Sequence, residues 1–186
     1  MCHDLRQAVA AVRVLASIAV DDVDATQRRL DAIVGQCDWL SAVIDVGLEP
    51  AEPRTIVDVS DVVAHVVARA KITSSAMIYF DPAPRLNAWT CEVGLGRIVE
   101  NLLENAIHAA GAGTVQVQVF HRGQNVVVTV ADDGPGIGGV AARTSLGLTI
   151  VRTAAIPCGA RISSAKPDGR GYQVAVSLDA WDGAGR

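Results

Sequence analysis

Two asparagines at helical spacing are the first residues of this sequence that could do chemistry. Asn101 and Asn105 stand four apart in the stretch N-L-L-E-N-A-I-H-A-A, so a helix would place both amides on one face. Two amides on an otherwise apolar helix indicate either a binding face or the solvent-facing edge of an amphipathic helix. The pair alone does not decide between these interpretations.

A second candidate follows where an apolar stretch ends in D-D-G-P-G-I-G-G. Asp132 supplies a carboxylate there, and the glycines after it let the backbone approach a ligand closely, although an acidic turn would look similar. A third motif, S-L-G-L-T-I-V from Ser145, opens a helix after a glycine-rich stretch. Free N–H groups and the helix dipole at such a position favour phosphate. The order of the three motifs is more informative than any one of them.

These motifs need a scaffold, and the hydrophobic pattern predicts a mixed α/β domain around them. The longest helix is predicted from Glu92 to Ala110, with a wide apolar face, and Gly111 is placed to end it. Ser60 would cap an earlier helix, and a proline-containing loop would follow Phe80. Strands are predicted at 54–58, 76–80, 114–120, 125–131, 160–165 and 172–178, and a last helix at 146–155. Helices on one face of a mixed sheet would form an α/β sandwich.

The first 49 residues have a purely helical pattern instead. Apolar stripes cover residues 5–19 and 30–48, the second close to a heptad repeat. The sequence therefore predicts an α+β chain, with an antiparallel helical hairpin over 1–49, a short linker, and the sandwich domain over 54–180. Because a lone hairpin exposes its apolar seam, we expect a homodimer in which two hairpins form a four-helix bundle.

Composition restricts the partners and the compartment. A formal net charge of −4 and a pI near 5.5 leave no broad basic surface, which argues against nucleic acid as a partner. Apolar runs are far shorter than the roughly 20 residues of a membrane span. No secretory signal is recognisable, so we expect a cytoplasmic protein. Four scattered cysteines without C-x-x-C spacing predict free, mostly buried thiols.

Taken in order, the three motifs resemble the N, G1 and G2 boxes of the histidine-kinase ATPase domain, which has the gyrase-type ATP-binding fold. The resemblance covers nearly all of residues 54–178 and implies a Bergerat-type site for ATP. There Asp132 would hydrogen-bond the adenine amino group, Asn105 would ligate Mg²⁺, and Asn101 would contact phosphate or metal. The other nucleotide-binding residues that the resemblance implies are His108, Gly134, Gly136, Ile137, Ser145, Leu146, Gly147 and Leu148.

Three departures from the family pattern bear on nucleotide turnover. Only seven residues separate Ile137 from Ser145, whereas the family's lid over ATP is longer and contains aromatic residues. Ser145 also replaces the first glycine of the G2 box. His108 stands where the family often has lysine, so it would be a weaker, pH-dependent phosphate contact. We expect slow turnover or weak retention of the nucleotide.

The start of the chain carries the other half of the family signature. His3-Asp4-Leu5-Arg6-Gln7 resembles the phosphoacceptor box, although Ala8 replaces its usual proline. His3 would be the phosphoacceptor, since a neutral imidazole, with an ordinary pKa of about 6.5, is a usable nucleophile near pH 7. Asp4 would accept the Nδ1 proton and leave Nε2 facing the γ-phosphate. Gln7 would orient water during dephosphorylation of the partner, or is a plain surface residue.

These observations predict an ATP-dependent protein-histidine kinase of a two-component system. It would autophosphorylate His3 and pass the phosphoryl group to an aspartate in the receiver domain of a response regulator. Because His3 lies at the very start of the chain, the signal would come from a separate sensor protein or from residues upstream.

Two alternatives to the kinase remain. A histidine phosphotransferase with a degenerate ATPase domain is favoured by the short lid, and a non-catalytic dimeric scaffold would bind a regulator or a nucleotide without chemistry. The intact Asn105, Asp132, Gly134 and Gly136 oppose the phosphotransferase.

Overall fold

The computed structural model describes residues 52–81, 84–135, 151–152, 154–166 and 171–183, together with seven single positions before residue 38. The predicted N-terminal hairpin thus lies almost wholly outside the described residues. All seven single positions are helical, namely Val14, Ala25, Thr26, Arg29, Leu30, Ile33 and Cys37. No helix in the described part of the chain is long and apolar enough to cross a membrane.

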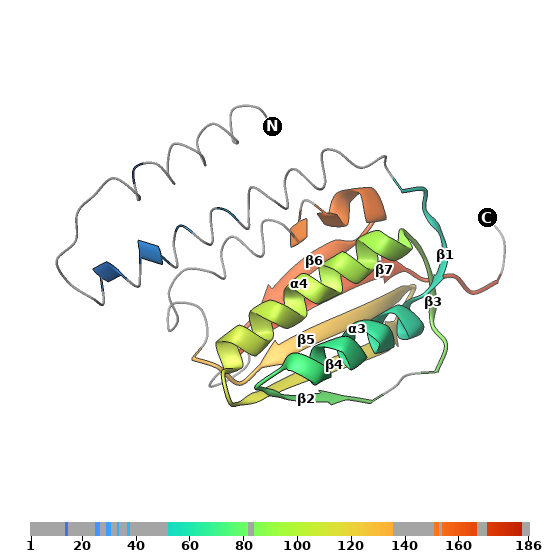
Figure 1. Cartoon of the computed structure of the whole chain (residues 1–186). Helices are drawn as coiled ribbons and strands as arrows, with labels where there is room; N and C mark the ends of the chain where they lie inside the picture. The colour runs from blue at the N-terminus through green and yellow to red at the C-terminus, as the bar shows by residue number, and fades with distance from the viewer. Residues whose placement is uncertain are drawn as a thin grey trace.

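A five-stranded sheet in the spatial order β2-β4-β5-β7-β6 forms the centre of the domain (Figure 1). Its strands are β2 (Met77–Phe80), β4 (Thr114–Arg122), β5 (Asn125–Asp132), β6 (Arg161–Ala165) and β7 (Tyr172–Asp179). β2 pairs with β4 in parallel, and the other neighbouring strands pair antiparallel. The sheet is therefore mixed, as predicted.

Two helices, α3 (Val59–Thr73) and α4 (Glu92–Ala110), cover one face of this sheet (Figure 1). α4 has the predicted bounds, and Gly111 ends it with a φ of 62°, a conformation that residues with side chains rarely adopt. The apolar face of α4 is buried against the sheet, with Leu95, Ile98 and Val99 at 0% exposure. The last helix is described at residues 151, 152 and 154–158 and ends beyond the predicted 155.

The predicted cap of α3 is wrong by two residues. The Asp58 side chain, not that of Ser60, accepts hydrogen bonds from the first free N–H groups of the helix, those of Ser60 and Asp61, at 3.1 and 3.3 Å. The Ser60 hydroxyl instead donates to the Pro84 carbonyl at 2.9 Å. Serine and aspartate both cap helices well, so the residue type alone did not exclude Ser60.

A strand that the sequence did not predict, β3 (Asn87–Thr90), lies in the presumed loop after Phe80. It pairs antiparallel with β1 (Thr55–Asp58) in a separate two-stranded sheet, and Ala88 also bridges Ala180. The rings of Trp89 and Trp181 pack with centroids 6.3 Å apart. The first and last described segments of the domain therefore meet at β3.

Replacing Asp58 with alanine should lower the free energy of unfolding by about 1 kcal/mol, because α3 loses the acceptor of two N–H groups. The exposed ion pair between Asp58 and Arg85, at 2.9 Å, adds little. Urea unfolding followed by circular dichroism would measure the loss. Asp61→Ala, in the same helical turn and exposed, is the control, and an equal loss in both variants would contradict the assignment of the cap.

Candidate functional site

One small pocket lies between the C-terminal half of α4 and the strands β5 and β7. Its lining comes from these three elements and consists of Leu102, Asn105, Ala106, Val130, Asp132, Tyr172 and Val174. The structure thus brings Asn105 and Asp132 to one apolar-walled pocket, although they belong to separate sequence motifs. This is the arrangement of a site in which a few polar groups orient a ligand within apolar walls.

Asp132 is a half-buried carboxylate at the end of β5. Its Oδ1 accepts a hydrogen bond from the backbone N–H of Gly134 at 3.0 Å. Burial raises the pKa of Asp132 above its ordinary value, and the adjacent charge of Asp133 adds to this, while backbone hydrogen bonds from Gly134 and Tyr172 oppose it. A carboxylate whose pKa is raised by burial in a pocket is a candidate for ligand recognition.

The adjacent Asp133 has a structural contact instead. Its two carboxylate oxygens accept hydrogen bonds from the Thr114 N–H and hydroxyl, at 2.9 and 2.6 Å. These bonds tie the end of β5 to the start of β4. Of the two neighbouring acids, only Asp132 lines the pocket.

Two glycines permit the close packing beside Asp132. A Cβ at Gly134 would collide with the carbonyl oxygen of Ala109 in the last turn of α4 and lie 2.8 Å from the carbonyl carbon. Gly171 has a φ of 95°, and a Cβ there would collide with the carbonyl oxygen of Asp132. A side chain at either position would push α4 or β7 away from the end of β5.

The other predicted residues of α4 lie outside the pocket lining. The Asn101 amide nitrogen donates to the Arg97 carbonyl of its own helix at 2.8 Å, and His108 is exposed in the last turn. The remaining predicted site residues lie outside the described residues, and their roles stay predictions. These are His3, Asp4, Gln7, Gly136, Ile137, Ser145, Leu146, Gly147 and Leu148.

Sequence reasoning missed Tyr172 and the apolar lining of the pocket. Tyr172 lies directly opposite Asp132 in the β5–β7 register, and Val174 lies opposite Val130. The signal was available, because the alternation in the last strand places Tyr172 and Val174 on the same face of the sheet as the core. What the sequence could not supply is the pairing of β7 with β5.

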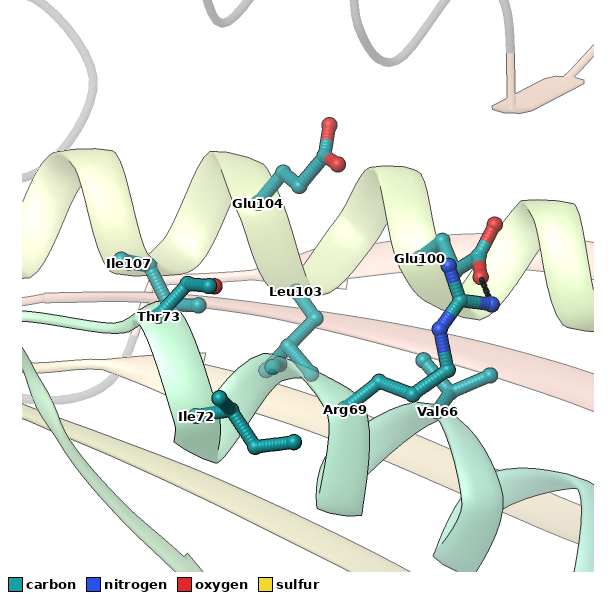
Figure 2. Close-up of a pocket in the computed structure, with 9 residues that line it drawn as sticks. Val66, Arg69, Ile72, Thr73, Glu100, Leu103, Glu104 and Ile107 are labelled. Atoms are coloured by element: carbon teal, nitrogen blue, oxygen red, sulfur yellow. Dashed lines mark hydrogen bonds and ion pairs between the residues drawn. The ribbon is translucent and has the colours of Figure 1, made fainter.

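A larger hollow of about 390 Å³ lies between α3 and α4 (Figure 2). An ion pair of 2.7 Å between Arg69 and Glu100 crosses it, and Ile72 on its border is 83% exposed. It contains none of the residues that the sequence motifs single out. The small pocket, which contains Asn105 and Asp132, is therefore the candidate site.

Comparisons with known proteins are consistent with this geometry. Residues 90–182 match the family model described as histidine kinase-, DNA gyrase B-, and HSP90-like ATPase. No curated protein sequence matches the chain significantly.

Solved structures share its fold at low sequence identity. Histidine kinase AdeS of Acinetobacter baumannii is 16% identical with a TM-score of 0.64, over 95% of this chain and 97% of that one. The ATP-binding domain of PrrB from Mycobacterium tuberculosis is 22% identical with a TM-score of 0.59, over 70% and 100%. Full-length ShkA in complex with AMPPNP is 20% identical with a TM-score of 0.61, over 96% and 43%.

The family match spans half of the 186 residues and includes α4, β5 and β7, the elements that form the pocket. The chain therefore belongs to the family of histidine kinase-, DNA gyrase B- and HSP90-like ATPases.

Proposed function

We propose that this chain is an ATP-dependent protein-histidine kinase of a two-component system. In this proposal it autophosphorylates His3 and passes the phosphoryl group to an aspartate of a response regulator. The observation that carries the proposal is the pocket in which α4 places Asn105 beside Asp132 of β5. Membership in the ATPase family and the shared fold of several histidine kinases support it.

The chemical groups that line the pocket suit adenine. Asp132 would accept a hydrogen bond from the exocyclic amino group, and its neighbours Leu102, Val130 and Val174 would contact the ring. Guanine would turn a carbonyl oxygen toward the same carboxylate, and two facing acceptors would reject it. A complex of the structurally similar ShkA with AMPPNP supports an adenine nucleotide as ligand.

Mg²⁺ would bind through the carboxamide oxygen of Asn105. This ion prefers oxygen ligands, keeps several waters, and binds through one or two protein groups plus substrate phosphates. One amide on α4 beside the nucleotide would meet this requirement. Asn101, one helical turn earlier, uses one amide N–H in its bond to Arg97, so its carboxamide oxygen would be the group that contacts metal.

The N-terminal hairpin would provide the phosphoacceptor and the dimer interface. Leu30, a residue of the predicted seam, is helical and 50% exposed, as expected for an apolar seam that a second copy covers. The receiver domain of a response regulator would take the phosphoryl group from His3. A histidine phosphotransferase remains the second candidate, because only seven residues separate Ile137 from Ser145.

Asp132→Asn should abolish ATP binding in calorimetry. The carboxamide would need its oxygen for the Gly134 N–H, which leaves an NH₂ group facing the adenine amino group. The adjacent Asp133→Asn is the matched control and should bind ATP normally, although the fold should be less stable without the charged acceptor for Thr114. Equal ATP affinity of Asp132→Asn and the wild type would contradict the assignment.

The raised pKa of Asp132 also sets the direction of two pH effects. ATP affinity of the wild type should fall as the pH drops through this raised pKa, because the protonated acid no longer accepts the same hydrogen bond. When the pKa of a carboxyl group is higher in the folded than in the unfolded protein, ionisation of that group lowers the free energy of unfolding at any pH above both values. At pH 7, the urea concentration that unfolds Asp132→Asn should therefore be equal to or higher than the concentration that unfolds the wild type.

Leu30→Asp should convert the dimer into monomers, because it places a charge in the apolar seam. Arg28→Asp, at the outermost heptad position two residues earlier, introduces the same side chain away from the seam; it is the control and should remain dimeric. Analytical ultracentrifugation at micromolar concentration would measure both. A monomeric wild type would contradict the four-helix bundle.

Incubation with labelled Mg-ATP distinguishes a kinase from a phosphotransferase. We expect the wild type to acquire an alkali-stable, acid-labile phosphoryl group. Both Asn105→Asp and His3→Gln should acquire none, the first because its metal coordination is disturbed and the second because it lacks the nucleophile. With a phosphorylated regulator as donor, Asn105→Asp should still accept label, whereas His3→Gln should not.

Two results would overturn parts of this assignment. If the wild type accepts label from the regulator but never from ATP, the phosphotransferase is correct and the kinase is wrong. If His3→Gln is labelled by either route, His3 is not the phosphoacceptor.

A further inference from the structure

Two buried thiols meet at the N-terminal end of α4, the end away from Asn105. Cys91 is the residue before the first turn of α4, and Cys158 ends the last helix; they are 2% and 1% exposed. The Cys91 Sγ lies 3.6 Å from the carbonyl oxygen of Pro157, the residue directly before Cys158. Gly94 leaves room for the two thiols, because a Cβ there would collide with the Cys158 sulfur and lie 3.3 Å from the Cys91 Cβ.

The segment that leads into the domain covers this pair. The Glu52 carboxylate accepts hydrogen bonds from the N–H groups of Val93 and Gly94, at 3.1 and 3.0 Å, and so caps α4. The backbone carbonyl of the same residue accepts a hydrogen bond from the Cys91 Sγ at 3.2 Å. Cys91 is therefore both the partner of Cys158 and a donor to the linker.

Arg54 binds the same segment to the helix that ends at Cys158. Its guanidinium donates to the carbonyls of Pro157 and Ile156, at 2.6 and 3.1 Å. Residues 52–54 thus contact the start of α4 through Glu52 and the end of the last helix through Arg54. These are the two chain segments that carry Cys91 and Cys158.

We propose that Cys91 and Cys158 form a redox site, a dithiol that hydrogen peroxide converts to a disulfide and whose oxidation loosens Glu52 from α4. Neither the ATPase family nor the phosphoryl transfer proposed above requires this pair. The site lies where the linker joins the domain, so its oxidation state would change how the segment preceding β1 is held.

The chemistry balances with one peroxide per pair. The sulfur of Cys91 attacks a peroxide oxygen, the O–O bond breaks, and Cys91 becomes a sulfenic acid with release of one water. The sulfur of Cys158 then attacks the Cys91 sulfur, the S–S bond forms, and a second water leaves with the displaced oxygen and the Cys158 proton. Two thiols lose two protons and two electrons, and peroxide is reduced to two waters.

The order of attack follows from the surroundings of the two sulfurs. Burial, together with the neighbouring Cys91, raises the pKa of the Cys158 thiol to about 12, which keeps it protonated. Because Cys158 stays protonated, we assign Cys91 as the first nucleophile and Cys158 as the resolving thiol.

Oxidation and linker release are coupled in both directions. A disulfide has no S–H, so the Glu52 carbonyl loses the donor that it has in the reduced form. By thermodynamic linkage, a change that releases Glu52 from α4 must shift the dithiol–disulfide equilibrium toward the disulfide by the same free energy.

The test uses the full chain with Cys2→Ser and Cys37→Ser, so that only the buried pair remains. After treatment with hydrogen peroxide, intact mass spectrometry should show loss of two hydrogens, and peptide mapping should join Cys91 to Cys158 in a form that dithiothreitol reverses. In a redox buffer of oxidised and reduced dithiothreitol, adding Glu52→Ala should shift the dithiol–disulfide equilibrium toward the disulfide on the order of fivefold, the factor that corresponds to a lost helix cap. Glu104→Ala, an exposed glutamate in the middle of α4, should leave this equilibrium unchanged.

Circular dichroism of each variant before oxidation shows whether it is folded. The test for the disulfide itself uses the protein in which only Cys2 and Cys37 are replaced. Failure of the folded background protein to form the Cys91–Cys158 disulfide, or oxidation that stops at sulfinic acid on one cysteine, overturns the redox site. Equal dithiol–disulfide equilibria for Glu52→Ala and Glu104→Ala overturn its coupling to the linker.

Discussion

Burial of one face of α4 against the mixed sheet is the interaction on which the candidate site depends. Leu95, Ile98 and Leu103 are almost wholly removed from solvent, and burial of such a side chain stabilises a fold by about 1.5–3 kcal/mol. The same helix supplies Leu102, Asn105 and Ala106 to the pocket. The position of Asn105 relative to Asp132 is therefore fixed by packing over the whole length of α4.

Two adjacent acids at the end of β5 illustrate how one strand can contribute both to a pocket and to stability. Side chains alternate along a strand, so Asp132 and Asp133 meet different surroundings. Asp133 bonds to Thr114 and holds two strands together, whereas Asp132 is half buried in a pocket that raises its pKa. The unfavourable burial of Asp132 is the expected cost of holding a carboxylate ready for a ligand.

Much of the domain could be predicted because its elements follow their own local patterns. α4 has a wide apolar stripe and a glycine at its end, so its bounds were correct, and the alternating strands on either side of Gly123 were found as a hairpin. β3 was missed because its four residues lie after prolines and gain their hydrogen bonds from β1, which is distant in sequence.

The pocket was only half predictable for a related reason. Asn105 and Asp132 belong to local motifs, whereas Tyr172 and Gly171 matter through their contacts with the end of β5. The junction of Glu52, Cys91 and Cys158 depends in the same way on tertiary contacts, since scattered cysteines carry no spacing signal. In each case the missing information is which distant segments are neighbours.

The small β1–β3 sheet has a consequence for how this domain can be combined with others. β1 lies on one side of β3, Ala180 bridges β3 as well, and the Trp181 N–H bonds to the Asn87 carbonyl at 2.8 Å (Figure 1). The chain therefore enters and leaves the domain at the same place. A unit with adjoining entry and exit points can be appended to, or inserted within, unrelated polypeptides during evolution without rebuilding its interior.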